Sequence, residues 1–143
     1  MKCLIEKFHK FLVPVVFHVV LAFVLPSLAT AAALTVTGGS ADESAGKAVF
    51  NVHVDDAVAG GFSVVATFGG GTASGSDYTS TTQTLTFSGA AGEDVTLEVP
   101  ITPDDDVEGT ETFTVTLSPD NGVTGTSATG TITETDTAAL SIA

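Results

Sequence analysis

The sequence predicts an all-β fold, an antiparallel β-sandwich of about seven short strands, and three observations predict it. Apolar residues alternate with polar residues in several short runs, a pattern that buries one face of a strand and exposes the other. Glycine-rich turn sequences separate these runs. No stretch carries apolar residues at the 3, 4, 7 spacing of an amphipathic helix, so essentially no helix is expected.

The expected strands can be placed in chain order. A weak first strand covers 33–37, and clear alternation marks 50–54 as the second. The others are expected at 61–68, 85–87, 95–101, 113–117 and 125–133. Seven short strands in about 100 residues are typical of a sandwich. Pro100 should occupy an edge strand or a bulge, because proline cannot donate a hydrogen bond to a neighbouring strand.

The first 31 residues have the three parts of a secretory signal peptide. Three lysines form a basic start, an apolar run covers 11–25, and small residues follow. We expect cleavage after Ala31, with Ala33 as the second choice. The apolar run is shorter than the roughly 20 residues that cross a bilayer, and an uncleaved membrane anchor is the alternative. The mature protein is therefore expected to be secreted or displayed on the cell surface.

Removal of the signal peptide leaves a strongly acidic domain. The chain has a formal net charge of −13, and residues 32–143 keep sixteen acidic residues with Lys47 as the single cation. Such charge repels nucleic acids and anionic membranes, so no nucleic acid is expected as a partner, and a membrane only through an uncleaved signal segment. The one cysteine, Cys3, leaves with the signal peptide, so the mature domain has no disulfide. A small exported domain of this kind needs another stabiliser or a good core, and a bound metal would serve.

Acidic residues concentrate in TPDDDVEGTETF, residues 102–113, where no cation lies among Asp104, Asp105, Asp106, Glu108 and Glu111. The segment should form the loop between two strands. Glu111 has the parity of the apolar residues that follow it, so it should point to the core side at the tip of the sandwich. A lone carboxylate there would be costly to desolvate.

Other acids fall at turns that can share this end of the sandwich: Asp42, Glu43, Asp77, Glu134 and Asp136. Repulsion among so many carboxylates would loosen the loops unless a cation bound them. Calcium is the natural candidate, because it takes 6–8 oxygen ligands in flexible geometry, whereas magnesium demands a tighter octahedron. Zinc is not expected, because His53, an outward-facing strand residue, is the only histidine left.

Four segments resemble a Calx-beta domain: GTASGSDY (71–78), LTF (85–87), VTLEVPITPDDDVEGTETFTVTLS (95–118) and TGTITETD (129–136). The resemblance implies an immunoglobulin-like β-sandwich over residues 32–136 that binds calcium at the loops of one end. Calx-beta domains occur in regulatory loops of sodium–calcium exchangers, in some integrin tails and as tandem repeats in exported microbial surface proteins. The signal peptide favours the last setting.

The resemblance also implies a set of metal ligands, namely Glu43, Asp77, Asp104, Glu108, Glu111 and Asp136. Two departures imply fewer ions or weaker binding. Pro103 stands where calcium-binding members have Asp, and Thr135 separates two acids where those members often have consecutive ones. The alternatives are that residues 104–106 form a solvated turn and that Asp77 serves only its own turn.

Three classes of function compete. The first is a calcium-binding structural or adhesive module that contacts neighbouring repeats or other surface proteins. The second is a metal-free spacer or interaction domain. The third is a glycosidase that uses Glu108 and Glu111 as its acid pair. The chain has no Trp and one Tyr, so a sugar-stacking cleft, and hence an enzyme, is not expected.

The end of the chain repeats the start of the mature domain. Ala-Ala-Leu occurs at 32–34, where it opens the first strand, and again at 138–140. We therefore expect residues 137–143 to begin a truncated next repeat. The alternative is that this tail packs on its own domain as an extra edge strand.

Overall fold

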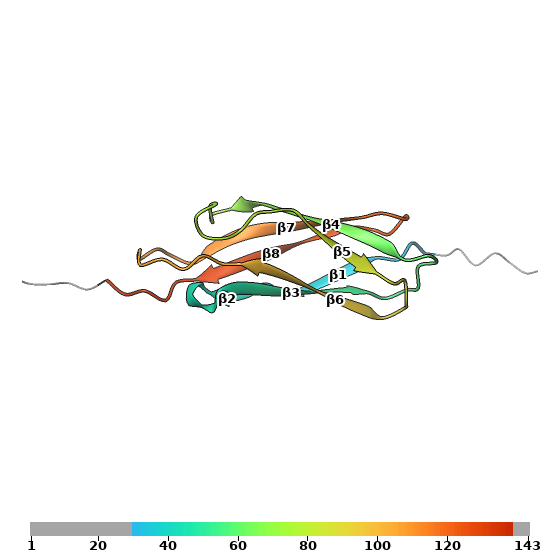
Figure 1. Ribbon diagram of the computed structural model, residues 1–143, viewed down its shortest axis with the longest axis horizontal. Helices are drawn as coiled ribbons and strands as arrows, with labels where there is room; N and C mark the ends of the chain where they lie inside the picture. The colour runs from blue at the N-terminus through green and yellow to red at the C-terminus, as the bar shows by residue number, and fades with distance from the viewer. Residues whose placement is uncertain (1–29, 139–143) are drawn as a thin grey trace, which may run out of the picture.

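The computed structural model of the chain describes residues 30–138 (Figure 1). The predicted signal peptide lies outside the described residues except for its last two positions, and so do residues 139–143 of the predicted tail. Within 30–138 the helical structure amounts to one 3-10 turn, η1 (Glu43–Ala45), so this part of the chain holds no helix that could span a bilayer.

The described chain forms two packed β-sheets, which confirms the predicted all-β sandwich (Figure 1). The three-stranded sheet has the order β1 (Leu34–Gly38), β3 (Lys47–Val54), β6 (Glu93–Pro100). The five-stranded sheet has the order β2 (Ser40–Asp42), β8 (Thr126–Thr133), β7 (Glu111–Pro119), β4 (Phe62–Gly71), β5 (Gln83–Phe87). The strand pairs are antiparallel except for β2 and β8, which are parallel.

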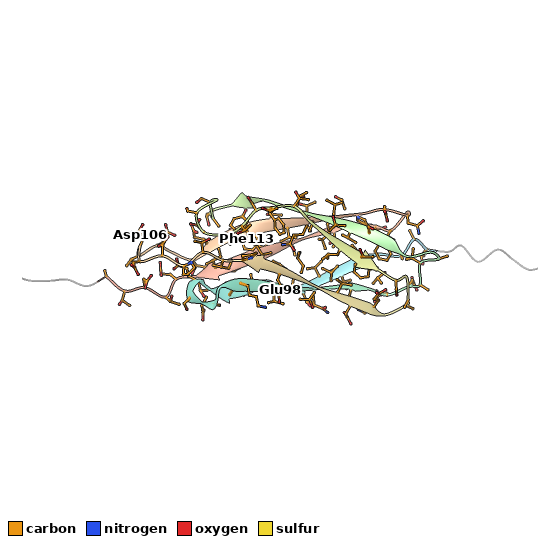
Figure 2. All side chains as sticks on the ribbon, in the orientation of Figure 1. Glu98, Asp106 and Phe113 are labelled. Carbon is orange, nitrogen blue, oxygen red and sulfur yellow. The ribbon has the colours of Figure 1, made fainter. Side chains whose placement is uncertain are left out.

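Alternate residues of both sheets meet between them and form the core. Figure 2 shows Phe113 in this interior, where its ring packs edge-on against Phe50 and stacks on Tyr78 with a centroid distance of 4.4 Å. Tyr78 is only 4% exposed. Pro100 closes β6, an edge strand of its sheet, as its missing N–H requires. The predicted strand alternation is therefore the pattern that builds the core.

The first strand of the sandwich divides between the two sheets at Gly38 and Gly39. Both glycines have positive φ, +89° and +92°, a conformation that side chains disfavour. The N–H of Gly39 donates to the Val49 carbonyl of one sheet, and its carbonyl accepts from Thr131 of the other. The chain can then continue as β2, a short strand that the sequence analysis did not predict because three residues show no alternation.

We expect Gly39→Ala to destabilise the fold by about 2 kcal/mol or more, the usual cost of forcing extra atoms into a packed core. A Cβ at this position would overlap the ring of Phe50, and the positive φ adds strain. Urea denaturation measures the loss. Gly75→Ala is the control, because a Cβ there meets open space. Equal free energies of unfolding for the two variants would contradict the steric argument.

The outer face of the three-stranded sheet carries paired charges. Lys47 of β3 forms an ion pair with Glu98 of β6, labelled in Figure 2. Further along the same strands, Nδ1 of His53 lies 2.9 Å from Oδ1 of Asp94, and Nε2 lies 3.0 Å from Oδ1 of Asp55. The carboxylate of Asp94 is the main reason why the pKa of His53 is raised above its usual value of 6.5.

The raised pKa of His53 predicts a small pH dependence of stability. Its ion pairs should stabilise the fold fully below pH 6.5, the value of the unfolded chain, and this contribution should disappear as the pH rises through the higher folded-state pKa. The effect is the difference between the unfolding free energies of wild type and His53→Gln, measured by urea denaturation from pH 5 to 9. A difference that stays constant across this range would contradict it.

Candidate metal centre

The acidic loops lie together at one end of the sandwich. The loop from β6 to β7 reaches furthest, and Figure 2 shows Asp106 near its tip. The Asp77 turn is fixed to this loop, because the N–H of Thr102 donates to the Asp77 carbonyl at 2.8 Å. η1 follows β2 at this end, and the chain leaves β8 beside it, since Asp42 pairs with Thr133. Four separate segments therefore bring carboxylates to one place.

The first cluster, called trio A here, consists of Asp77, Glu108 and Glu111, whose ligand oxygens all lie within 4.8 Å of one another. Asp77 is only 8% exposed. Its carboxylate accepts the backbone N–H of Ser74 and the hydroxyl of Ser76, and the Ser74 bond is the main reason why its pKa is lowered. Asp77 thus fixes its own turn and also lies within trio A.

Glu111, the first residue of β7, is half-buried, and its pKa is raised to about 7. Loss of hydration is the largest cause, followed by its hydrogen bond with Asp77 and the negative charges of Asp77 and Glu108. The pKa of Glu108 is raised as well, again first by desolvation and then by the charge of Asp77. Full ionisation of trio A near neutral pH is therefore unfavourable without a cation.

The second cluster, trio B, consists of Glu43, Glu134 and Asp136, again with ligand oxygens within 4.8 Å of one another. Glu43 is 8% exposed and lies in η1. The N–H of Asp104 donates to Glu43 and lowers its pKa, but burial and the charge of Glu134 raise it, so that the net change is upward. Glu43 and Glu134 of trio B therefore repel each other.

The two trios are connected through the β6–β7 loop. Glu134 accepts the backbone N–H groups of Asp136 and Glu108, each at 2.6 Å, and these bonds lower its pKa. The charge of Glu43 in turn raises the pKa values of Glu108 and Glu111 in trio A. The trios therefore form one electrostatically coupled site, whose carboxylates also hold the loop by its N–H groups.

The structure brings five of the six predicted ligands into the two trios and leaves Asp104 outside them. The N–H of Asp104 donates to Glu43, while its exposed carboxylate accepts the N–H of Asp106 at 2.8 Å. Residues 104–106 are exposed. Glu134 is the residue that the predicted set missed, although the sequence TETD places it two positions before Asp136.

The donor atoms of the site fit a hard cation. All six side chains of the two trios offer carboxylate oxygens. Oxygen-only sites of flexible loops suit calcium better than zinc, which prefers nitrogen and sulfur ligands. Lys47, the single cation of residues 30–138, is paired with Glu98 on the outer face and does not neutralise the trios.

Comparison with known proteins matches a family model for the Calx-beta domain to residues 29–142. A crystal structure of the apo-form Calx CBD1 domain has 21% sequence identity and a TM-score of 0.60, and the match covers 72% of this chain and 98% of that chain. The calcium binding domain CBD12 of CALX1.1 has 24% identity and a TM-score of 0.61 over 71% of this chain and 45% of that chain.

A third structure, CBD12 from CALX1.2, has 24% identity and a TM-score of 0.60, and the match covers 66% of this chain and 41% of that chain. At these identities the structural matches show a shared fold. This chain spans less than half the length of the two CBD12 chains. A search of curated proteins found no match.

Proposed function

Because the chain belongs to the Calx-beta domain family, we propose that it is a calcium-binding structural or adhesive module of an exported protein. The observation that carries the proposal is the pair of coupled carboxylate trios, which Lys47, the single cation of residues 30–138, does not balance. Two of the matched structures support it in part, since one is named a calcium binding domain and another an apo form.

The proposed ligands follow from the geometry. Asp77, Glu108 and Glu111 would hold one ion, and Glu43, Glu134 and Asp136 would hold another. Backbone oxygens and water would complete the 6–8 ligands that calcium takes. The ions would neutralise the trios and join the loops that carry them, so their role is structural.

We further propose that the module acts by binding and not by catalysis. The glycosidase alternative needs one carboxylate that is free to protonate a leaving group and a cleft that holds the sugar. Glu108 and Glu111 instead share a site with Asp77, and Tyr78 and Phe113, which lie close to these acids along the chain, are buried in the core. Export rests on the predicted signal peptide of residues 1–31, and neighbouring repeats or other surface proteins are the proposed partners.

We expect calcium to raise the melting temperature of the domain, because the ion binds the folded loop end and not the unfolded chain. At a free calcium concentration 100 times Kd the stabilisation should be about 2.7 kcal/mol. For a domain of this size that is a rise of several degrees. Thermal unfolding of the protein in calcium and in chelator measures it. Identical melting curves would support the alternative, a metal-free spacer.

A further inference from the structure

Asn121 and Gly122 form the tip of the turn between β7 and β8, at the end of the sandwich opposite the trios (Figure 1). Both residues have positive φ, +51° and +75°, and the N–H of Val123 donates to the Asp120 carbonyl at 3.2 Å. Positive φ at both central residues is the feature of a type I′ turn, in which Asn-Gly is the preferred sequence. The backbone conformation therefore explains why these two residues stand here.

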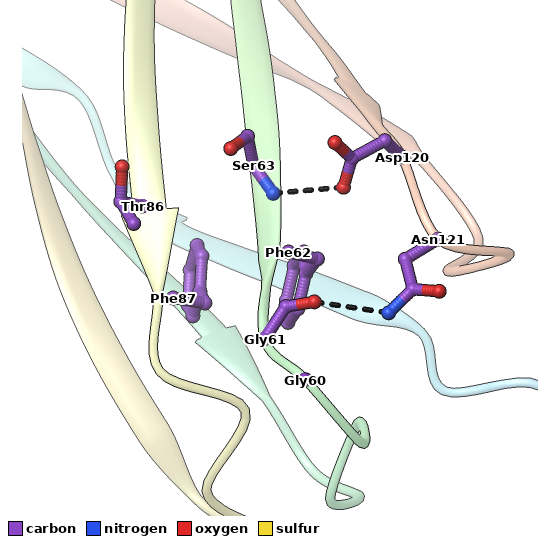
Figure 3. Close-up of a pocket in the computed structure, with 8 residues that line it drawn as sticks. All are labelled: Gly60, Gly61, Phe62, Ser63, Thr86, Phe87, Asp120 and Asn121. Carbon is purple, nitrogen blue, oxygen red and sulfur yellow. Dashed lines mark hydrogen bonds between the residues drawn. The ribbon is translucent and has the colours of Figure 1, made fainter.

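The side chain of Asn121 also connects two turns. Its Nδ2 donates to the carbonyl oxygens of Ala59 and Gly61, at 3.2 and 2.9 Å, and Figure 3 shows the bond to Gly61. Beside it, Asp120 accepts the N–H of Ser63 at 2.8 Å. The amide of Asn121 therefore ties the β7–β8 turn to the turn before β4.

The same dipeptide is chemically labile. The backbone nitrogen of Gly122 can attack Cγ of Asn121, since a glycine has no side chain to hinder its approach. The new N–Cγ bond closes a succinimide ring as the Cγ–Nδ2 bond breaks, and ammonia leaves with the proton of the attacking nitrogen. Water then opens the ring to aspartate or isoaspartate. The reaction consumes one water, releases one ammonia and needs no other reagent.

We propose that Asn121 is a site of spontaneous deamidation that the folded turn protects. In the fold the leaving amide is held by two carbonyl oxygens, so both hydrogen bonds must break before Cγ can turn toward the Gly122 nitrogen. Each bond should slow the reaction about fivefold, and the two together about 25-fold. The product disrupts this end of the sandwich, because a carboxylate cannot donate to the two carbonyls and adds a negative charge beside them.

The rate of deamidation at Asn121 is tested by incubating the full chain in two samples, one folded and one unfolded in urea, at the same pH and temperature. Peptide mapping by mass spectrometry then follows aspartate and isoaspartate at position 121. We expect the unfolded chain to react about 25-fold faster than the folded chain. Gly122→Ala should slow the reaction in urea, where the strain of alanine at positive φ is absent. Equal rates in both states, or no reaction at Asn121 in urea, would overturn the proposal.

The consequence of the reaction is tested with Asn121→Asp, which reproduces one product. Loss of the two hydrogen bonds should raise the unfolded fraction about 25-fold. Thr124→Asp adds the same charge at an exposed position of the same loop and serves as the control. Asn121→Gly keeps the positive φ while removing the amide, and it should also populate the unfolded state more than wild type. Stability equal to the Thr124→Asp control for both Asn121 variants would show that the amide does not tie the two turns.

Discussion

Glu111→Gln should weaken calcium binding about 100-fold while stabilising the calcium-free domain. Mutation of a residue that hydrogen-bonds a metal ligand typically lowers metal affinity 10–100-fold. Loss of a proposed ligand carboxylate should therefore lower calcium affinity by at least the upper value. Without calcium, the neutral amide removes repulsion within trio A. Desolvation and neighbouring charges raise the pKa of Glu111 from 4.5 to about 7, and allowing for partial exposure this corresponds to about 1–2 kcal/mol.

The size of the stabilisation that Glu111→Gln gives the calcium-free domain depends on pH. The folded-state pKa of Glu111 lies above its unfolded value, so its bound proton stabilises the fold fully below pH 4.5. That contribution is lost as the pH rises to about 7. Calcium-free wild type and Glu111→Gln should therefore have similar stability near pH 4.5, and the variant should be more stable at pH 8. Urea denaturation in chelator at the two pH values measures this difference.

Asp105→Asn is the matched control for Glu111→Gln. It removes one negative charge from the same loop, but Asp105 is exposed and belongs to neither trio. Calcium titration by calorimetry should give this variant an affinity within a few-fold of wild type. If the two variants lose affinity equally, the site has been placed wrongly and the loop acts only through its total charge.

Phe113→Ala should destabilise the domain by about 3–5 kcal/mol, the usual cost of removing a buried aromatic ring. The ring is fully buried between the sheets and packs against Phe50 and Tyr78. It also fills the space next to Gly130, where a Cβ would overlap it. Urea denaturation in chelator measures the loss separately from calcium binding.

The Phe113 variant also tests how the metal centre is supported. Phe113 lies two residues after Glu111 on β7, and Tyr78 follows Asp77, so the stacked rings are close along the chain to two members of trio A. We therefore expect weaker calcium binding as well. Val65→Ala, at an exposed position of β4, is the control for loss of apolar side-chain atoms. A loss below about 1 kcal/mol for Phe113→Ala would mean that the core rearranges to fill the cavity.

The fold could be predicted from the sequence because the alternation of apolar and polar residues that marks each strand is a local feature of the chain. Alternation such as Phe113, Val115 and Leu117 states directly which face of a strand is buried, and each of the seven predicted strands is present. β2 was missed because its existence depends on pairing with β8, a partner about ninety residues away in the chain. The sequence of Ser40–Asp42 contains no local pattern that predicts this pairing.

The sequence predicted that the candidate site consists of acidic residues, but it did not predict that these residues form two separate trios. Sequence parity indicated that Glu111 points inward, and the structure places it half-buried in trio A with the buried Asp77. The separation into two trios depends on which loops meet, and the pairing of β2 with β8 brings η1 and the chain after β8 together. The predicted set of ligands included Asp104 and left out Glu134 for the same reason. The position of an acid in a sequence motif does not determine the direction in which its carboxylate points.

The division of the first strand between β1 and β2 has a mechanical consequence. The described chain leaves the sandwich at opposite ends, and β2 runs parallel to β8 (Figure 1). Tension on the two ends would therefore slide β2 and β8 past each other along their length. Their hydrogen bonds, and the parallel bridge between Ala33 and Thr124, would be loaded in shear and would have to break together. A chain threaded in this way resists extension at its first and last strands, before any antiparallel hairpin can unzip.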